Sequence, residues 1–163
     1  MTPEKSIDPG VRIGHVHLKV ADIERALHFY CDVLGFDLMQ RMGDSAAFVS
    51  AGGYHHHIGL NTWESRGGVP PASRMTGLCH LAILYPTRRS LAEALKRLID
   101  AGISLEGASD HGVSEGLYLR DPDENGVELY WDRPESDWPL TPSGGRDMFT
   151  KPLDLQKLLD ALG

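Results

Sequence analysis

The chain has 163 residues, of which 41% are hydrophobic and 24% are charged, a composition typical of a globular protein. The formal charge of −7 argues against a nucleic-acid binder, which needs a basic surface. No apolar run reaches the roughly 18 residues that a membrane span needs, and the first ten residues lack the apolar centre of a signal peptide. Because Cys31 and Cys79 cannot build a disulfide framework, we expect a cytoplasmic protein that binds neither nucleic acid nor membranes.

The first half of the chain predicts one strand, one helix and three further strands. In the first strand the alternation puts Val16 and Leu18 on one face and His15 and His17 on the other. Asp22 is the expected N-cap of an amphipathic helix that ends at a glycine. The three following strands are expected over residues 36–42, 46–50 and 54–63.

The second half repeats this order after a loop rich in glycine, proline and serine. An apolar strand is followed by Ser90 and Glu93, which form a capping-box signature and predict the start of a helix. Asn125-Gly126 predicts a tight turn with positive φ, and it separates the last two strands. The four strands of this half are expected over residues 78–85, 103–105, 115–120 and 127–131.

The order βαβββ therefore occurs twice, over residues 11–63 and 77–132. One half has too little core to fold alone, so we expect both modules to share one domain, residues 1–133. The predicted fold is α+β, with the two modules forming a cupped, barrel-like mixed sheet and a metal site on its concave face. Residues 134–163 are expected to form a connector and an apolar C-terminal helix, and no separate domain.

The repeat gives four polar side chains equivalent places. His15 and His80 lie in the first strand of their halves, and His57 and Glu128 lie in the last. Since the apolar phase of each strand must face its helix, we expect these side chains on the opposite, concave face. A single histidine on a strand is usually structural, but three imidazoles and a carboxylate around one point suit Fe(II), Mn, Co, Ni or Zn.

Four segments resemble the vicinal-oxygen-chelate superfamily, which includes glyoxalases, bleomycin-resistance proteins and extradiol dioxygenases. They are GHVHLKVADIERALHFYCDVLGF, GYHHHIGLNTW, GLCHLAI and YLRDPDENGVELYWDRP, and the resemblance covers residues 11–133. It implies metal ligands at His15, His57, His80 and Glu128. Extradiol dioxygenases look as if they use the places of His15, His80 and Glu128 alone, which leaves open positions on the metal.

The stretch DHGVSEGLYLRDPDENGVELYWDRP resembles the catechol-2,3-dioxygenase-like branch. The resemblance implies catalytic roles for His111 as a general acid–base and for Tyr118 as a hydrogen-bond partner of a developing oxyanion. It favours Fe(II) as cofactor, a small-molecule substrate chelated through adjacent oxygens, and a homodimer.

Two other functions fit the same residues. A glyoxalase-type isomerase or lyase would use His57 as a fourth ligand, with a redox-silent metal such as Zn or Ni. A binding module like the bleomycin-resistance proteins would sequester a small molecule without a tightly bound metal. Metal content and oxygen uptake separate these possibilities.

Overall fold

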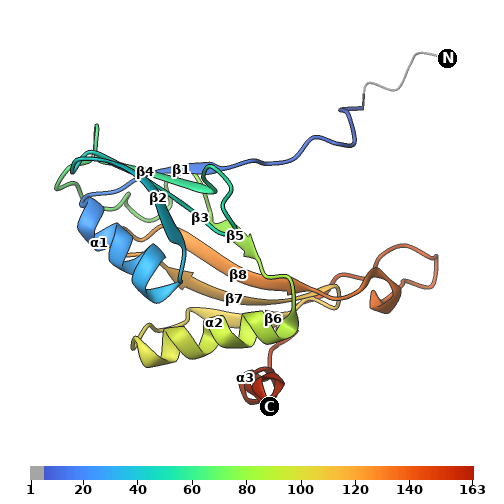
Figure 1. The fold of residues 1–163 in the computed structure, drawn as a ribbon. Coiled ribbons are helices and arrows are strands. Elements are labelled where there is room, and N and C mark those ends of the chain that lie inside the picture. The colour runs from blue at the N-terminus through green and yellow to red at the C-terminus, as the bar shows by residue number, and fades with distance from the viewer. Residues whose placement is uncertain (1–5) are drawn as a thin grey trace.

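The computed structural model describes residues 6–163 and shows the predicted α+β repeat (Figure 1). The first module forms a four-stranded sheet in the order β1-β4-β3-β2, and the second forms a five-stranded sheet in the order β5-β8-β7-β6-β9. The elements of the first module are β1 (Val16–Lys19), α1 (Ile23–Leu27), β2 (Asp37–Met42), β3 (Ala46–Ser50) and β4 (Ile58–Asn61). Those of the second are β5 (Leu81–Leu84), α2 (Arg88–Asp100), β6 (Gly107–Asp110), β7 (Ser114–Arg120) and β8 (Gly126–Asp132), followed by β9 (Lys151–Pro152) and α3 (Leu155–Leu159).

Each sheet pairs its first and last module strands in parallel and its remaining strands antiparallel. Val16 lies opposite Ile58, and Leu81 lies opposite Val127. The predicted alternation in β1 is confirmed, because Leu18 is buried while His17 is exposed. His15 and His80 each fall one residue before their strand begins, which gives them equivalent places in the two sheets.

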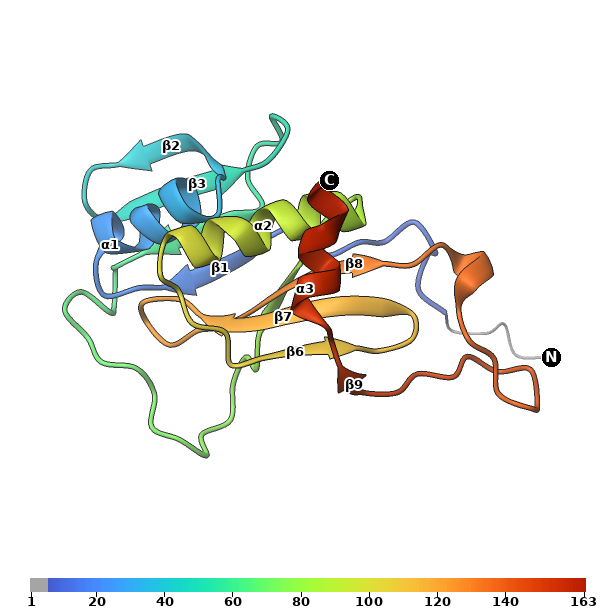
Figure 2. The same ribbon diagram turned by 90° about the horizontal axis from the view of Figure 1, so that it is seen from below.

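One apolar core lies between the helices and both sheets. Figure 2 shows α1 and α2 on the same side of the strands, with α3 lying across α2. Asp22 caps α1 by accepting a hydrogen bond of 2.8 Å from the Arg25 amide, as predicted, and a π-helical segment (His28–Val33) continues the helix. The buried cluster draws on both modules, including Leu18, Ile23, Tyr30, Leu60, Leu91, Leu95, Leu98, Leu117 and Leu129.

The start of α2 differs from the prediction. Thr87, and not Ser90, is the N-cap, and the capping box joins Thr87 to Ser90. Ser90 completes the capping box because its hydroxyl accepts a hydrogen bond of 3.1 Å from the Thr87 amide. Glu93 instead pairs with Arg89 at 3.2 Å on the helix surface.

Three other local predictions were wrong. Residues 103–105 form no strand, because the chain leaves α2 through an irregular segment and β6 begins only at Gly107. Of the predicted strand 54–63, residues 54–57 and 62–63 also lie outside β4. In the β7–β8 turn the positive φ falls on Glu124 (64°) and not on Asn125-Gly126. Gly126 is needed for a different reason, since a Cβ there would collide with the backbone carbonyl of Cys79.

The β7–β8 turn fastens the second module to the first. The buried Asp121 carboxylate accepts hydrogen bonds from the Asn125 amide and, at 2.9 Å, from the Tyr30 hydroxyl of the first module. Asp123 accepts from the Ala21 amide at 3.1 Å. Because the charged turn reaches directly into the first module, it fixes the two sheets relative to each other.

The predicted C-terminal helix is present and packs on the body of the protein. Leu158 of α3 is fully buried against the core, and Arg88 at the start of α2 donates to the Lys157 carbonyl at 3.0 Å. The connector before α3 contributes β9, which extends the second sheet by pairing with β6. No helix within residues 6–163 is long and apolar enough to cross a membrane.

Candidate functional site

His80 and Glu128 form the best-defined pair among the predicted ligands. His80 precedes β5 and Glu128 lies on the neighbouring β8, with Nε2 of the imidazole 3.1 Å from Oε2 of the carboxylate. The Glu128 side chain is only 13% exposed. Two ligand atoms that share a metal ion at about 2.1 Å each lie about 3 Å apart. The donor types and their separation therefore fit two neighbouring ligands of one divalent cation, which would displace the proton between them.

Tyr118 and His111 continue this pair into a chain of four side chains. Tyr118 lies opposite Glu128 on the adjacent β7, and its hydroxyl donates to Oε1 of the carboxylate at 2.9 Å. Nε2 of His111 lies 2.7 Å from the same hydroxyl. The order His80, Glu128, Tyr118, His111 links the predicted metal ligands of the second module to the predicted catalytic residues.

The Tyr118 hydroxyl has one proton and two neighbours that can accept it. Burial and the hydrogen bond to Glu128 raise the pKa of Tyr118 to about 12, so the phenol stays protonated at neutral pH. The proton can point to the carboxylate or, when His111 Nε2 carries none, to the imidazole. This arrangement can transfer a proton between His111 and the neighbourhood of Glu128.

His15 and His57 lie on the first module. With His80 they line a groove between the modules of about 990 Å³, whose other lining residues are mostly apolar. Within residues 6–163, however, no three His, Cys, Asp or Glu side chains are grouped closely enough to hold one metal ion. The structure thus brings together His80 and Glu128, while the meeting of the whole ligand set stays a prediction.

The hydrogen bonds of His57 affect its use as a ligand. The Ala51 amide donates to its Nδ1 at 3.3 Å, and the Ser50 hydroxyl lies 3.0 Å from the same atom. A neutral imidazole that accepts at Nδ1 carries its proton on Nε2. Neither nitrogen then offers a free lone pair to a metal, which disfavours His57 as a ligand in this conformation.

His55 and His56 of the first module lie beside His15. The ring centroids of His15 and His56 lie 4.3 Å apart, and His17 lies against Phe48 and Trp63. Burial, followed by the neighbouring imidazoles, lowers the pKa of His56, and burial with His15 lowers that of His17. Lower pKa values favour the neutral form of both rings.

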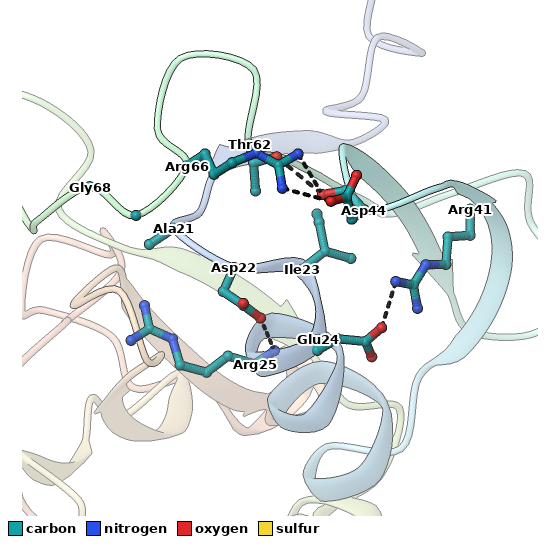
Figure 3. Close-up of a pocket in the computed structure, with 11 residues that line it drawn as sticks. Ala21, Asp22, Ile23, Glu24, Arg25, Arg41, Asp44, Thr62, Arg66 and Gly68 are labelled. Carbon is teal, nitrogen blue, oxygen red and sulfur yellow. Dashed lines mark hydrogen bonds and ion pairs between the residues drawn. The ribbon is translucent and has the colours of Figure 1, made fainter.

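A second pocket, of about 790 Å³, lies at the start of α1 and contains none of the predicted site residues (Figure 3). Its arginine side chains are paired with carboxylates. Arg66 contacts Asp44 at 2.7 Å, and Arg41 contacts Glu24 at 2.5 Å. Because these charges are compensated, the pocket presents no evident anion site.

Two residues near His111 and Glu128 were not predicted. A Cβ at Gly116 would lie 2.8 Å from Oε1 of Glu128, so the glycine makes room for the carboxylate. A glycine inside a strand is a recognisable signal of such a close approach. The Phe149 carbonyl lies 3.0 Å from Nδ1 of His111, and a backbone contact of this kind leaves no mark in the sequence.

Comparison with known proteins identifies the family. Residues 12–129 match the model of the Glyoxalase/Bleomycin resistance protein/Dioxygenase superfamily. A catechol-2,3-dioxygenase of Bacillus subtilis (strain 168) is 42% identical over 158 residues, which cover 97% of this chain and 54% of that protein. A biphenyl-2,3-diol 1,2-dioxygenase of Rhodococcus globerulus is 34% identical over 122 residues, covering 74% of this chain and 63% of that protein. This chain therefore spans less than two thirds of both relatives.

Solved structures agree on the fold. A glyoxalase/dioxygenase from Nostoc punctiforme superposes with a TM-score of 0.65 at 18% identity, covering 79% of this chain and 97% of that chain. A glyoxylase/bleomycin resistance protein/dioxygenase domain from Frankia sp. EAN1pec gives a TM-score of 0.62 at 27% identity, covering 78% and 100%. The matched sequence and the paired βαβββ modules together show that this chain belongs to the glyoxalase/bleomycin resistance/dioxygenase superfamily.

Proposed function

We propose that this protein is a divalent-metal-dependent enzyme that acts, like an extradiol dioxygenase, on a small molecule with two adjacent oxygens. The observation that supports it most is the continuous chain His80, Glu128, Tyr118 and His111 on the second module. Both dioxygenase relatives named above carry aromatic diols or catechol in their names, which supports the same substrate class.

His80 and Glu128 would hold the cation, with His15 as the expected third ligand and Fe(II) as the favoured metal. When bound, a divalent cation supplies Lewis-acid polarisation of the substrate oxygens. Tyr118 then stabilises negative charge on a substrate oxygen by hydrogen bonding, and His111 accepts or returns a proton through that hydroxyl. The apolar lining of the groove, including Tyr130, favours an aromatic ring over a charged metabolite.

The glyoxalase-type alternative needs His57 as a fourth ligand. The Ala51 amide hydrogen bond to Nδ1 of His57 disfavours that role. In favour of it, His57 lines the same groove as His80. A non-catalytic binding module would use the groove without retaining a metal. Each alternative makes a different prediction for metal content.

A matched pair of histidine variants tests the proposal. The protein is loaded anaerobically with Fe(II), and oxygen uptake is measured with catechol as substrate. We expect the wild type to consume oxygen, His80→Ala to lose more than about 100-fold of this activity, and His57→Ala to stay within about 10-fold of the wild type.

The other outcomes would contradict the proposal in distinct ways. Retention of Zn or Ni by a protein inactive with oxygen, and loss of the metal in His57→Ala, would support the isomerase or lyase. A protein that retains none of these metals would support the binding module. Full oxygen uptake by His80→Ala would contradict the assignment of His80 as a metal ligand.

A further inference from the structure

The connector between β8 and α3 contacts His111 from outside the segment that the family model matches. The Phe149 amide donates to the His111 carbonyl at 3.3 Å, and the Phe149 carbonyl lies 3.0 Å from Nδ1 of the His111 ring. A carbonyl oxygen can only accept a hydrogen bond. A bond between these two atoms therefore requires Nδ1 to carry the proton.

The location of that proton decides whether the other ring nitrogen, Nε2, donates or accepts a hydrogen bond. A neutral imidazole with its proton on Nδ1 has a lone pair on Nε2, which faces the Tyr118 hydroxyl at 2.7 Å. We propose that Phe149 is a positioning residue, whose backbone carbonyl holds His111 in the Nδ1–H tautomer and thereby makes Nε2 a proton acceptor for Tyr118. In this tautomer the single Tyr118 proton turns from Glu128 to His111. The catalytic meaning of this tautomer rests on the function proposed above, but the tautomer itself does not.

Packing around Phe149 holds its carbonyl in place. Gly112 has a φ of 78°, and a Cβ there would lie 2.8 Å from both the Phe149 ring and Pro139. Nζ of Lys151 lies 4.3 Å from the centroid of the same ring, and Lys151 is the register partner of Asp110 where β9 joins β6. The aromatic ring thus closes over the turn that carries His111, and β9 fixes the residues that follow.

Ion pairs of Arg133, directly after β8, anchor the first end of the connector. Arg133 bonds to Asp110 at 2.8 Å, to the Gly112 carbonyl at 3.0 Å and to Glu115 at 3.0 Å. Glu115 is only 5% exposed and also accepts from Arg88 at 2.8 Å. Since both ends of the connector are anchored on the strands next to His111, the Phe149 carbonyl has a fixed position.

Thr150 offers the competing arrangement. Its hydroxyl lies 3.3 Å from Nδ1 of His111 and can donate to that atom if the ring proton is on Nε2. The Phe149 carbonyl, at 3.0 Å, would then face a lone pair. The Nε2–H tautomer keeps the Tyr118 proton on its bond to Glu128, whereas the Nδ1–H tautomer directs that proton to Nε2. The shorter contact to Nδ1, from the Phe149 carbonyl, favours the Nδ1–H tautomer, and the two arrangements give different nitrogen spectra.

The tautomer can be measured without any enzymatic assay. In metal-free protein with 15N-labelled histidine, at a pH where the rings are neutral, long-range 15N–1H NMR distinguishes Nδ1–H from Nε2–H, and His111→Gln assigns the signals. We expect Nδ1–H in the wild type and a shift toward Nε2–H in Phe149→Ala. Met148→Ala, an exposed neighbour in the connector, is the matched control and should leave the tautomer unchanged.

Thr150→Val tests the competing donor directly. We expect it to keep the Nδ1–H tautomer of the wild type. An Nε2–H tautomer in the wild type, converted to Nδ1–H by Thr150→Val, would overturn the proposal, and so would an unchanged tautomer in folded Phe149→Ala. The wild-type spectrum decides the question even if Phe149→Ala fails to fold.

Kinetics then link the tautomer to the proposed reaction. In Fe(II)-loaded protein we expect Phe149→Ala to lower kcat for catechol about 10-fold with little change in KM, and Phe149→Leu to recover most of the loss. An unchanged kcat in a Phe149→Ala protein whose tautomer has shifted would contradict the catalytic role. If no variant, including the wild type, consumes oxygen while the NMR results hold, the proposed function fails and the positioning by Phe149 stands.

Discussion

Tyr118 connects the proposed metal ligands with the proposed acid–base residue. Its hydroxyl touches a proposed metal ligand, Glu128, and a proposed acid–base residue, His111, at hydrogen-bond distance. The cross-strand pairing of β7 with β8 sets the first contact, and the turn before β7 sets the second. A side chain with two such neighbours should act with them as a unit.

Removing the Tyr118 hydroxyl should disconnect this unit. We expect Tyr118→Phe to lower kcat for catechol by about 100-fold with little change in KM, because the interaction is made with developing charge. The double variant Tyr118→Phe/His111→Gln should be about as slow as either single variant. Steady-state oxygen uptake tests this, and strictly multiplicative losses would show that the two residues act independently.

The sequence predicted those side chains that repeat or that match a family motif. His15 and His80 follow from the duplicated strand pattern, and Tyr118 and His111 follow from the resemblance of one segment. Phe149 could not be predicted, because its contact uses a backbone carbonyl that every residue type possesses.

At the scale of elements, the β7–β8 turn does more than connect two strands. It brings the buried Asp121 carboxylate to the Tyr30 hydroxyl of the first module, at 2.9 Å. Predictions from the sequence placed the turn correctly, because its residue types favour turns, but they assigned the positive φ to the wrong residues. The start of α2 was also displaced, since Thr87 and Ser90 both qualify as caps and only packing decides between them.

The contact between Tyr30 and Asp121 should contribute measurably to stability. Tyr30→Phe leaves a buried carboxylate with one donor fewer, so we expect the free energy of unfolding to fall by about 1–3 kcal/mol. Tyr54→Phe removes a hydroxyl from an exposed tyrosine and should change it by less than about 0.5 kcal/mol. Urea unfolding at neutral pH measures both, and equal effects of the two variants would refute the assigned role.

The same contact predicts a pH dependence. Burial, and then Asp121, raise the pKa of Tyr30 far above its ordinary value of 10.0. The unfolded chain therefore loses this phenolic proton at a lower pH than the folded protein, so stability falls as the pH rises above about 10. In Tyr30→Phe this part of the alkaline loss should disappear when urea midpoints are compared between about pH 8 and pH 11.

At the scale of the whole molecule, the duplication produces two sheets with one shared core and a groove between them. The repeat could be predicted because strand and helix periodicities differ clearly along the chain. The distance between the ligands of the two modules could not be predicted, because it depends on how the modules pack against each other. The structure brings together His80 and Glu128 of the second module, while His15 lines the groove together with His80.

The claim that His80 and Glu128 share one divalent cation is tested most directly by anaerobic calorimetric titration with Fe(II). We predict one Fe(II) per wild-type chain, affinity at least about 100-fold weaker in His80→Ala and in Glu128→Gln, and wild-type affinity in His28→Ala, an exposed histidine paired with Asp32. Unchanged Fe(II) affinity in both ligand variants would contradict the account, because no metal would then be held by these two side chains.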